Sequence, residues 1–256
     1  MSKSMMSKVG WIIFFIILWQ ILSVSDLFPK ALFPSPVSVL VSLLGSTADG
    51  TMPRALAYSL ELIGIGLLLG ISLALIMSVF AKLSPVFASL VETCLSIAHP
   101  LPGIALLPLV ILWVGVDSKA IIFIILHSVL WPLVQNLRAG FLAVPEVYLQ
   151  VGYNMGLSPL KQILYISLPA SLPYFLSGLE ISWARAWRSL VSAEMIFGAA
   201  GGVGGIGWLI FKNRVFMDTP GLFASLSVMI VIGILVESIL FRQLENRTIR
   251  KWGMYK

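Results

Sequence analysis

The residues most able to do chemistry in this 256-residue chain are charged groups set in a long apolar stretch. Arg185 and Arg188 are three residues apart, which places them on one face of a helix, and Glu180 and Glu194 flank them. Charged side chains at membrane depth are costly and mark functional sites. The arginines are predicted either to line a pathway for an anionic solute or to form structural ion pairs with Glu180, Glu194 or Glu61.

Two further side chains are predicted in the same pathway. Glu194 closes the charged stretch, and His99 lies beside Pro100 and Pro102. Two interpretations of His99 remain open. It lines the pathway or acts as a proton-sensitive switch, or it satisfies backbone groups that the prolines leave without partners.

Other kinds of chemistry have no support in the residue pattern. Cys94 is the only cysteine, and His99 and His127 are isolated, so neither a disulfide nor a metal site is expected. Residues 202–207 satisfy the dinucleotide-binding glycine pattern, but they follow an apolar helix rather than a strand. We expect 198–207 to be a flexible outer loop that acts as a gate, a docking surface or a simple connector. The phosphate-binding loop of ATPases does not occur, so no cofactor is expected on this chain.

Composition places these residues in a membrane protein. Apolar residues make up 59% of the chain and charged residues 11%, which is too little polar surface for a soluble globule. Apolar runs predict an all-α polytopic membrane protein, a single domain over 1–256 with six transmembrane helices. The predicted spans are residues 9–27, 58–81, 85–116, 120–137, 168–196 and 220–241.

Two local features modify this pattern. The third span contains two prolines and a glycine at 99–103, which should break it. We expect 85–98 to be a tilted or surface-lying helix that leads into a shorter spanning piece from Gly103 to Val116. Between the first two spans, a short interfacial helix at 37–44 is predicted, with Ser35 as its cap and Pro36 at its first position.

The distribution of basic residues predicts an orientation. The chain has 17 Lys and Arg residues against 11 Asp and Glu, and those outside the spans lie mainly on the side of the termini. The positive-inside rule then places both termini and the 138–167 loop in the cytoplasm. The basic excess therefore requires no nucleic-acid partner.

The 138–167 loop has its own local pattern. Residues 145–146 form a good helix start, and Gly156 suits the left-handed residue that closes such a helix. Ser158 and Pro159 then offer a second cap and helix start, and Pro169 limits the continuation. The pattern predicts a helix, a sharp turn and a second helix.

This loop resembles the cytoplasmic signature loop of binding-protein-dependent ABC importer permeases. The pattern of that family is Glu-Ala-Ala, three residues, Gly, nine residues, Ile, one residue and Leu-Pro. The match from Gly156 through Ile166 to Leu168 and Pro169 is complete, whereas the leading triplet here is Gln150-Val151-Gly152. We therefore expect the contact to depend on Gly156 and the helix-turn-helix shape rather than on an acid at position 150.

The resemblance implies a type I ABC importer permease in a bacterial inner membrane. Two copies of the permease would form the pathway, an external binding protein would deliver the solute, and two ATPase subunits carrying ATP and Mg²⁺ would dock at the 146–167 loops. The permease itself would not be an enzyme. The residues implied in ATPase coupling are Gln150, Val151, Gly152, Gly156, Ser158, Pro159, Ile166, Leu168 and Pro169.

Softer matches suggest a branch of the family. Residues 107–115, Ser192-Ala193-Glu194 and residues 250–253 resemble permeases of nitrate, sulfonate and taurine import. This implies a small anionic solute without naming it. The competing hypothesis is an ion-coupled secondary transporter that uses the charges of the fifth span as a relay.

Overall fold

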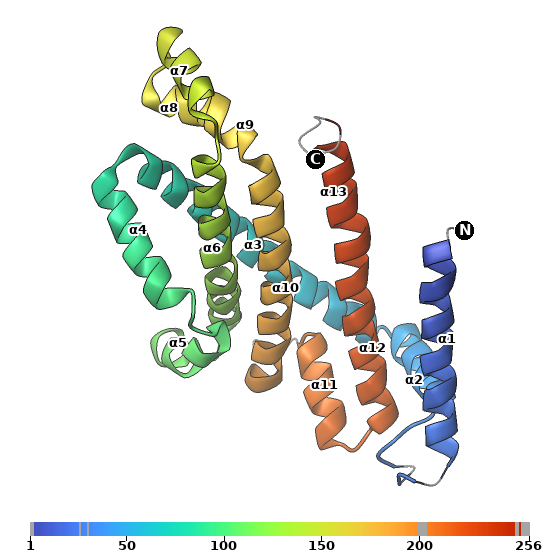
Figure 1. Ribbon diagram of the computed structural model, residues 1–256. Coiled ribbons are helices and arrows are strands. Elements are labelled where there is room, and N and C mark those ends of the chain that lie inside the picture. Colours follow the sequence, from blue (N-terminus) through green and yellow to red (C-terminus); the bar gives the residue numbers. More distant parts are fainter. Residues whose placement is uncertain (1–2, 26, 30, 199–203, 249–250, 252–256) are drawn as a thin grey trace.

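The computed structural model describes residues 3–25, 27–29, 31–198, 204–248 and 251. Every regular element in these ranges is helical, and the helices form an elongated bundle (Figure 1). Residues 199–203 of the predicted glycine-rich loop and most of the 250–253 motif lie outside the described residues.

The elements are numbered in chain order. The α-helices are α1 (Lys3–Val24), α2 (Pro36–Ala48), α3 (Thr51–Leu83), α4 (Pro85–Ala98), α5 (Leu107–Val114), α6 (Ser118–Leu142), α7 (Glu146–Asn154), α8 (Pro159–Gln162), α9 (Leu168–Ala170), α10 (Leu172–Phe197), α11 (Ile206–Val215), α12 (Thr219–Leu235) and α13 (Arg242–Arg247). A 3-10 helix, η1 (Gly103–Leu106), and two π-helices, η2 (Ile163–Ser167) and η4 (Val236–Phe241), join some of them.

Several helices can cross a membrane. By length and composition, three of those in the described ranges suffice: α3, α6 and the continuous helix Thr219–Arg247. A fourth is added if α4 and the segment Gly103–Val114, bent by 88° relative to one another, count as one span. Helix α10 has 26 residues but carries four charged side chains. Each of the six predicted spans overlaps a helix or a broken run of helices in the described residues.

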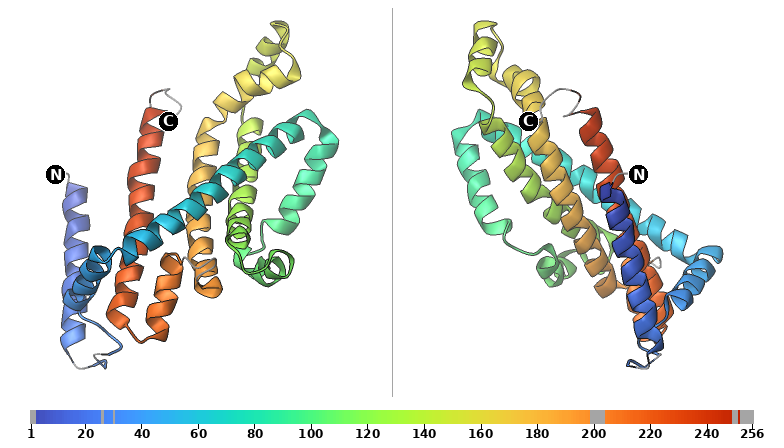
Figure 2. Two further views of the ribbon diagram at one scale, coloured as in Figure 1. Left: turned by 180° about the vertical axis from the view of Figure 1, so that it is seen from behind. Right: turned by 45° about the vertical axis from the view of Figure 1, so that its right-hand side comes forward.

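Helix α3 is longer than its predicted span. Its 33 residues extend about 50 Å at 1.5 Å per residue, more than the hydrocarbon thickness of about 30 Å. It accordingly crosses the other long helices obliquely (Figure 2). The helix begins before the predicted span and includes Arg54 in its first turn. The Nε atom of Arg54 donates a hydrogen bond to the Gly50 carbonyl at 2.9 Å and so supports this turn.

The predicted break in the third span is confirmed, and it separates two helical parts that point in different directions. Helix α4 ends at Ala98, and η1 begins at Gly103. Figure 1 shows α4 running beside α6, while α5 turns across the end of the bundle. Helix α4, and not α5, is therefore the part that runs along the length of the bundle. Helix α5 has only eight residues, about 12 Å, and is followed by its C-cap residue Gly115, whose φ is 82°.

The core lies where α6 packs between α3 and α10. Its aliphatic side chains are fully buried at Ile124, Ile125 and Val129. On α3, a Cβ atom added at Gly66 or Gly70 would overlap Ile125 or Val129, so these glycines allow the two backbones to approach closely.

Two short helices border this core. The predicted short helix after Ser35 is confirmed as α2, where the Ser35 hydroxyl accepts a hydrogen bond from the Ser38 backbone at 3.2 Å and Pro36 takes the first position. Helix α11 was not predicted. It packs between α10 and α12 in the region expected to be a loop, and the side chains of Ile206 and Leu209 are buried there.

Candidate functional site

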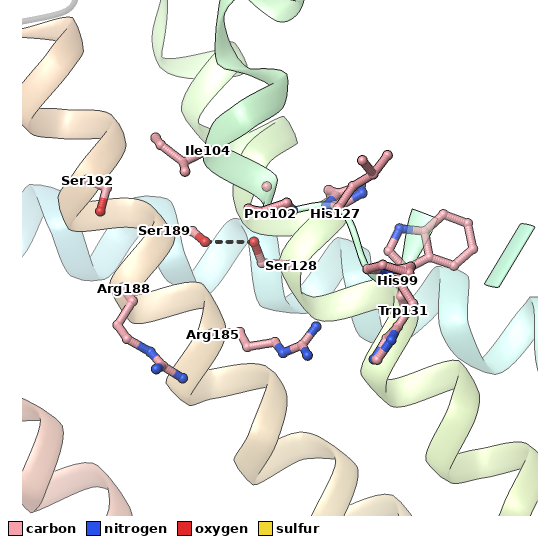
Figure 3. Close-up of a pocket in the computed structure, with 13 residues that line it drawn as sticks. His99, Pro102, Ile104, His127, Ser128, Trp131, Arg185, Arg188, Ser189 and Ser192 are labelled. Carbon is pink, nitrogen blue, oxygen red and sulfur yellow. Dashed lines mark hydrogen bonds between the residues drawn. The ribbon is translucent and has the colours of Figure 1, made fainter. Parts of the chain in front are cut away.

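The candidate site is an open cavity of about 480 Å³ formed by the broken segment after α4, by α6 and by α10 (Figure 3). Its lining combines basic, hydroxyl and aromatic side chains. The residues that line it are His99, Pro100, Leu101, Pro102, Gly103, Ile104, His127, Ser128, Trp131, Arg185, Arg188, Ser189 and Ser192.

The proline break places one wall of this cavity. Pro100 and Pro102 cannot donate backbone hydrogen bonds, so α4 stops and the chain turns towards α6. The turn comes so close to α6 that a Cβ atom at Gly103 would lie 2.7 Å from the Ser128 hydroxyl. His99 is thereby held at the cavity, together with the two arginines, as the sequence predicted it could be.

The two arginines enter the cavity from the same face of α10. Arg185 is half-buried and extends towards His99 and Trp131, whereas Arg188 is more exposed (Figure 3). The Nε atom of Arg188 donates to the Ala184 carbonyl at 2.9 Å. Among the described residues, neither guanidinium lies within 4.0 Å of a carboxylate. The ion pairs considered as the alternative role are therefore not formed within this part of a single chain.

Serines connect the two helices that carry the cavity. The hydroxyl oxygens of Ser128 on α6 and Ser189 on α10 are 2.8 Å apart, and the Ser182 hydroxyl donates to the Val129 carbonyl at 3.0 Å. Sequence reasoning assigned neither Ser128 nor Ser189 to the site, and it named Ser192 only as part of the branch motif. The available signal was the seven-residue spacing of Ser182 and Ser189, which places both on one helix face.

Glu194 occupies a different place from the arginines. It is 1% exposed, does not line the cavity, and accepts hydrogen bonds from the Ser59 hydroxyl at 2.7 Å and the Gly207 backbone at 2.8 Å. Ser59 in turn accepts from the Ile206 backbone at 2.9 Å. The carboxyl group therefore joins α3, α10 and the start of α11.

The described end of the glycine-rich segment is shaped by this contact. A Cβ atom at Gly205 would overlap the Glu194 carboxyl group, and one at Gly207 would overlap the Val191 carbonyl. Side chains are excluded because the backbone passes directly over the carboxyl group. Residues 204–207 are thus a close-packed cover, which corrects the expectation of a flexible loop for this part.

A second cavity of about 460 Å³ adjoins the first and shares His99 and Pro100 with it. It is also lined by Glu92 and Arg138, whose side chains form an ion pair at 3.7 Å. Leu142, the last residue of α6, borders it. The two cavities together extend from the arginines towards the end of α6 that leads into α7.

The predicted helix-turn-helix is present and projects from one end of the bundle (Figure 1). Helix α7 ends in a left-handed residue, Gly156, with φ 73°. Backbone bonds from Leu157 to Gly152 at 3.0 Å and from Gly156 to Tyr153 at 2.9 Å close the turn, as in a Schellman motif. A Cβ at Gly152 would lie 2.5 Å from Ile166, so this glycine lets α7 approach η2 closely.

Two details of the loop differ from the prediction. Ser158 takes the cap position before α8, but its side chain makes no capping hydrogen bond. Pro169 does not end the second helix. The π-helix η2 widens the turn before Pro169, α9 follows, and the helical path reaches α10 after Ser171. The remaining loop residues Gln150 and Val151 are exposed, and Leu168 is half-buried.

The family follows from comparison with known proteins. Residues 66–250 match the family described as "Binding-protein-dependent transport system inner membrane component". The chain belongs to this family. The match confirms the predicted resemblance, identifies the chain as a non-catalytic permease subunit, and decides against the secondary-transporter hypothesis.

Several relatives of this permease cover most of its length. The taurine transport system permease protein TauC of Escherichia coli (strain K12) is 26% identical over 93% of this chain and 86% of its own. The putative aliphatic sulfonates transport permease protein SsuC of Bacillus subtilis (strain 168) is 29% identical over 93% of this chain and 84% of its own. The nitrate import permease protein NrtB of Leptolyngbya laminosa is 30% identical over a shorter stretch, 61% of this chain and 56% of its own.

A solved structure shares the fold of this permease. A chain of the inward-facing MetNI methionine ABC transporter aligns with a TM-score of 0.53 at 14% sequence identity, covering 98% of this chain and 99% of that one. The all-helical permease fold is therefore confirmed. The permease is an inner-membrane, multi-pass protein.

Proposed function

We propose that two copies of this permease form the pathway of an ABC importer for a small anionic solute of the sulfonate, taurine or nitrate kind. Each copy would have six spans and a cytoplasmic loop, 138–167, that binds a separate ATPase subunit. ATP and Mg²⁺ would be held by those subunits, and an external binding protein would deliver the solute. The family and the names of the relatives support this proposal.

The position of the loop relative to the cavity supports its coupling role. The loop follows α6 directly, and its second half continues through η2 and α9 into α10. These are the helices that carry His127, Ser128, Arg185 and Arg188 into the cavity. A push on the loop would move both cavity walls as rigid helices. ATP-driven closure of the ATPases would thus switch the cavity between inward-open and outward-open forms, and hydrolysis would reset it.

The surface of the loop supports a protein partner. Helix α7 and its C-cap residue stand at the end of the bundle and leave four apolar or aromatic side chains at least half exposed: Val147, Val151, Tyr153 and Met155. An apolar helix face of this kind fits a groove in a soluble protein. The start of α1 and the end of α13 lie towards the same end of the bundle as this loop, and the excess of Lys and Arg supports a cytoplasmic location for that end.

Copurification tests the docking surface. The change Val151→Asp places a charge on the apolar face of α7, where Val151 is 50% exposed, and should abolish copurification of the ATPase from detergent-solubilised membranes. The matched control is Val215→Asp on α11, where the side chain is 56% exposed near the opposite end of the bundle. The control should retain the ATPase at the wild-type ratio. Full retention by Val151→Asp would contradict the proposed docking site.

A further inference from the structure

The charge balance of the cavity indicates what it binds. Two guanidinium groups face it, and no carboxylate is among its lining residues. Within the described part of the chain, Glu194 is engaged by Ser59, and Glu92, in the neighbouring cavity, is paired with Arg138. Cationic groups at membrane depth require compensation. Among the described residues no carboxylate lies within 4.0 Å of either guanidinium, which leaves a bound anion as a source of the compensating charge.

The donors in the cavity suit an oxygen-bearing anion. A guanidinium group presents a planar fork of N–H donors that matches two oxygens of a carboxylate or sulfonate. Ser128 and Ser189 place hydroxyl groups between the helices, and Ser192 adds a third one helical turn beyond Arg188 (Figure 3). The donors thus come from one face of α10 and the facing side of α6.

The rest of the lining can accommodate an organic group on the solute, but it does not favour a positively charged group on that solute. Leu101, Ile104 and Trp131 provide apolar wall. An ammonium group on the same solute would find no carboxylate in the described lining and would lie close to two cations. At the low dielectric of such a site, like charges repel more strongly than in water.

We infer that this cavity binds a simple oxoanion that lacks an ammonium group, such as an alkyl or aryl sulfonate, in preference to a zwitterionic aminosulfonate. The inference rests on the proposed import function and narrows its solute. It predicts that this permease prefers a solute other than taurine, although the taurine permease TauC is among its relatives. Selection would then occur in the permease as well as in the binding protein.

Direct binding to the permease–ATPase complex in nanodiscs, without the binding protein, tests the inference. The probes are ethanesulfonate and taurine, which differ only by one ammonium group. Isothermal titration calorimetry should give a Kd for ethanesulfonate at least tenfold lower than that for taurine, a difference of about 1.4 kcal/mol. Equal or tighter binding of taurine would overturn the inference.

Variants locate the site. Arg185→Met should weaken ethanesulfonate binding at least tenfold, Ser192→Ala should weaken it about threefold, and Arg185→Lys should fall between wild type and Arg185→Met. Lys119→Met, outside the cavity, should bind as the wild type does. If carboxylates of the second copy neutralise the arginines, neither probe binds the intact complex, and the inference fails. Retention of the ATPase in the same preparation reports on the proposed function separately.

Discussion

Replacing Glu194 with alanine should destabilise the fold, because this side chain joins three helices from a buried position. Its carboxyl group accepts hydrogen bonds from the Ser59 hydroxyl at 2.7 Å and the Gly207 backbone at 2.8 Å. Alanine leaves both buried donors without this acceptor, at about 1–3 kcal/mol each. Removing the buried carboxyl group offsets part of that loss. We expect the free energy of unfolding to fall by about 2–4 kcal/mol.

Glutamine at position 194 provides the comparison. Its amide oxygen can accept from the Gly207 backbone, and its amide nitrogen can donate to the Ser59 oxygen. Glu194→Gln should therefore lose less than half as much free energy of unfolding as Glu194→Ala. Glu61→Ala, which changes an exposed acid on α3, should stay within about 0.5 kcal/mol of wild type.

The assay is denaturant unfolding in detergent micelles, followed by tryptophan fluorescence. A double-mutant cycle with Ser59→Ala isolates the interaction, and coupling of about 0.5–3 kcal/mol between Ser59 and Glu194 is expected. A loss of under about 1 kcal/mol in Glu194→Ala, or additive effects of the two alanine changes, would refute the proposed role of this contact.

Three glycines give the remaining predictions. Gly66→Val should lower the free energy of unfolding by about 1–3 kcal/mol, because its Cβ atom would overlap Ile125. Gly64 has open space around it, so Gly64→Ala should raise the free energy of unfolding by about 0.5–1 kcal/mol. Denaturant unfolding in micelles measures both changes, and equal effects of the two substitutions would contradict the packing argument. Gly156→Ala should reduce solute transported per ATP hydrolysed, because a left-handed alanine costs about 1–2 kcal/mol, while Gly156→Asn should retain coupling. Unchanged coupling in an assembled Gly156→Ala complex would count against the role of this turn.

Local signals made the helices and the helix-turn-helix predictable. Ser35 with Pro36, and Gly156 with Pro159, act through the backbone of their own neighbours, so their effect does not depend on the rest of the fold. The break at Pro100 was predictable for the same reason. Helix α11 was missed because it begins among glycines that suggested a loop, and because its burial comes from α10 and α12.

The amino-acid sequence alone determined that this is a helical membrane protein with a helix-turn-helix loop, because apolar run length, proline positions and glycine positions express local backbone chemistry. Only the tertiary structure decided which charged residues of α10 line the cavity and which are buried between helices. Arg185 and Arg188 face an open cavity with His99, whereas Glu194, six residues beyond Arg188 on α10, is buried against Ser59 and Gly207. The helix places these side chains on different faces, and the neighbouring helices α3 and α11 cover only one of them.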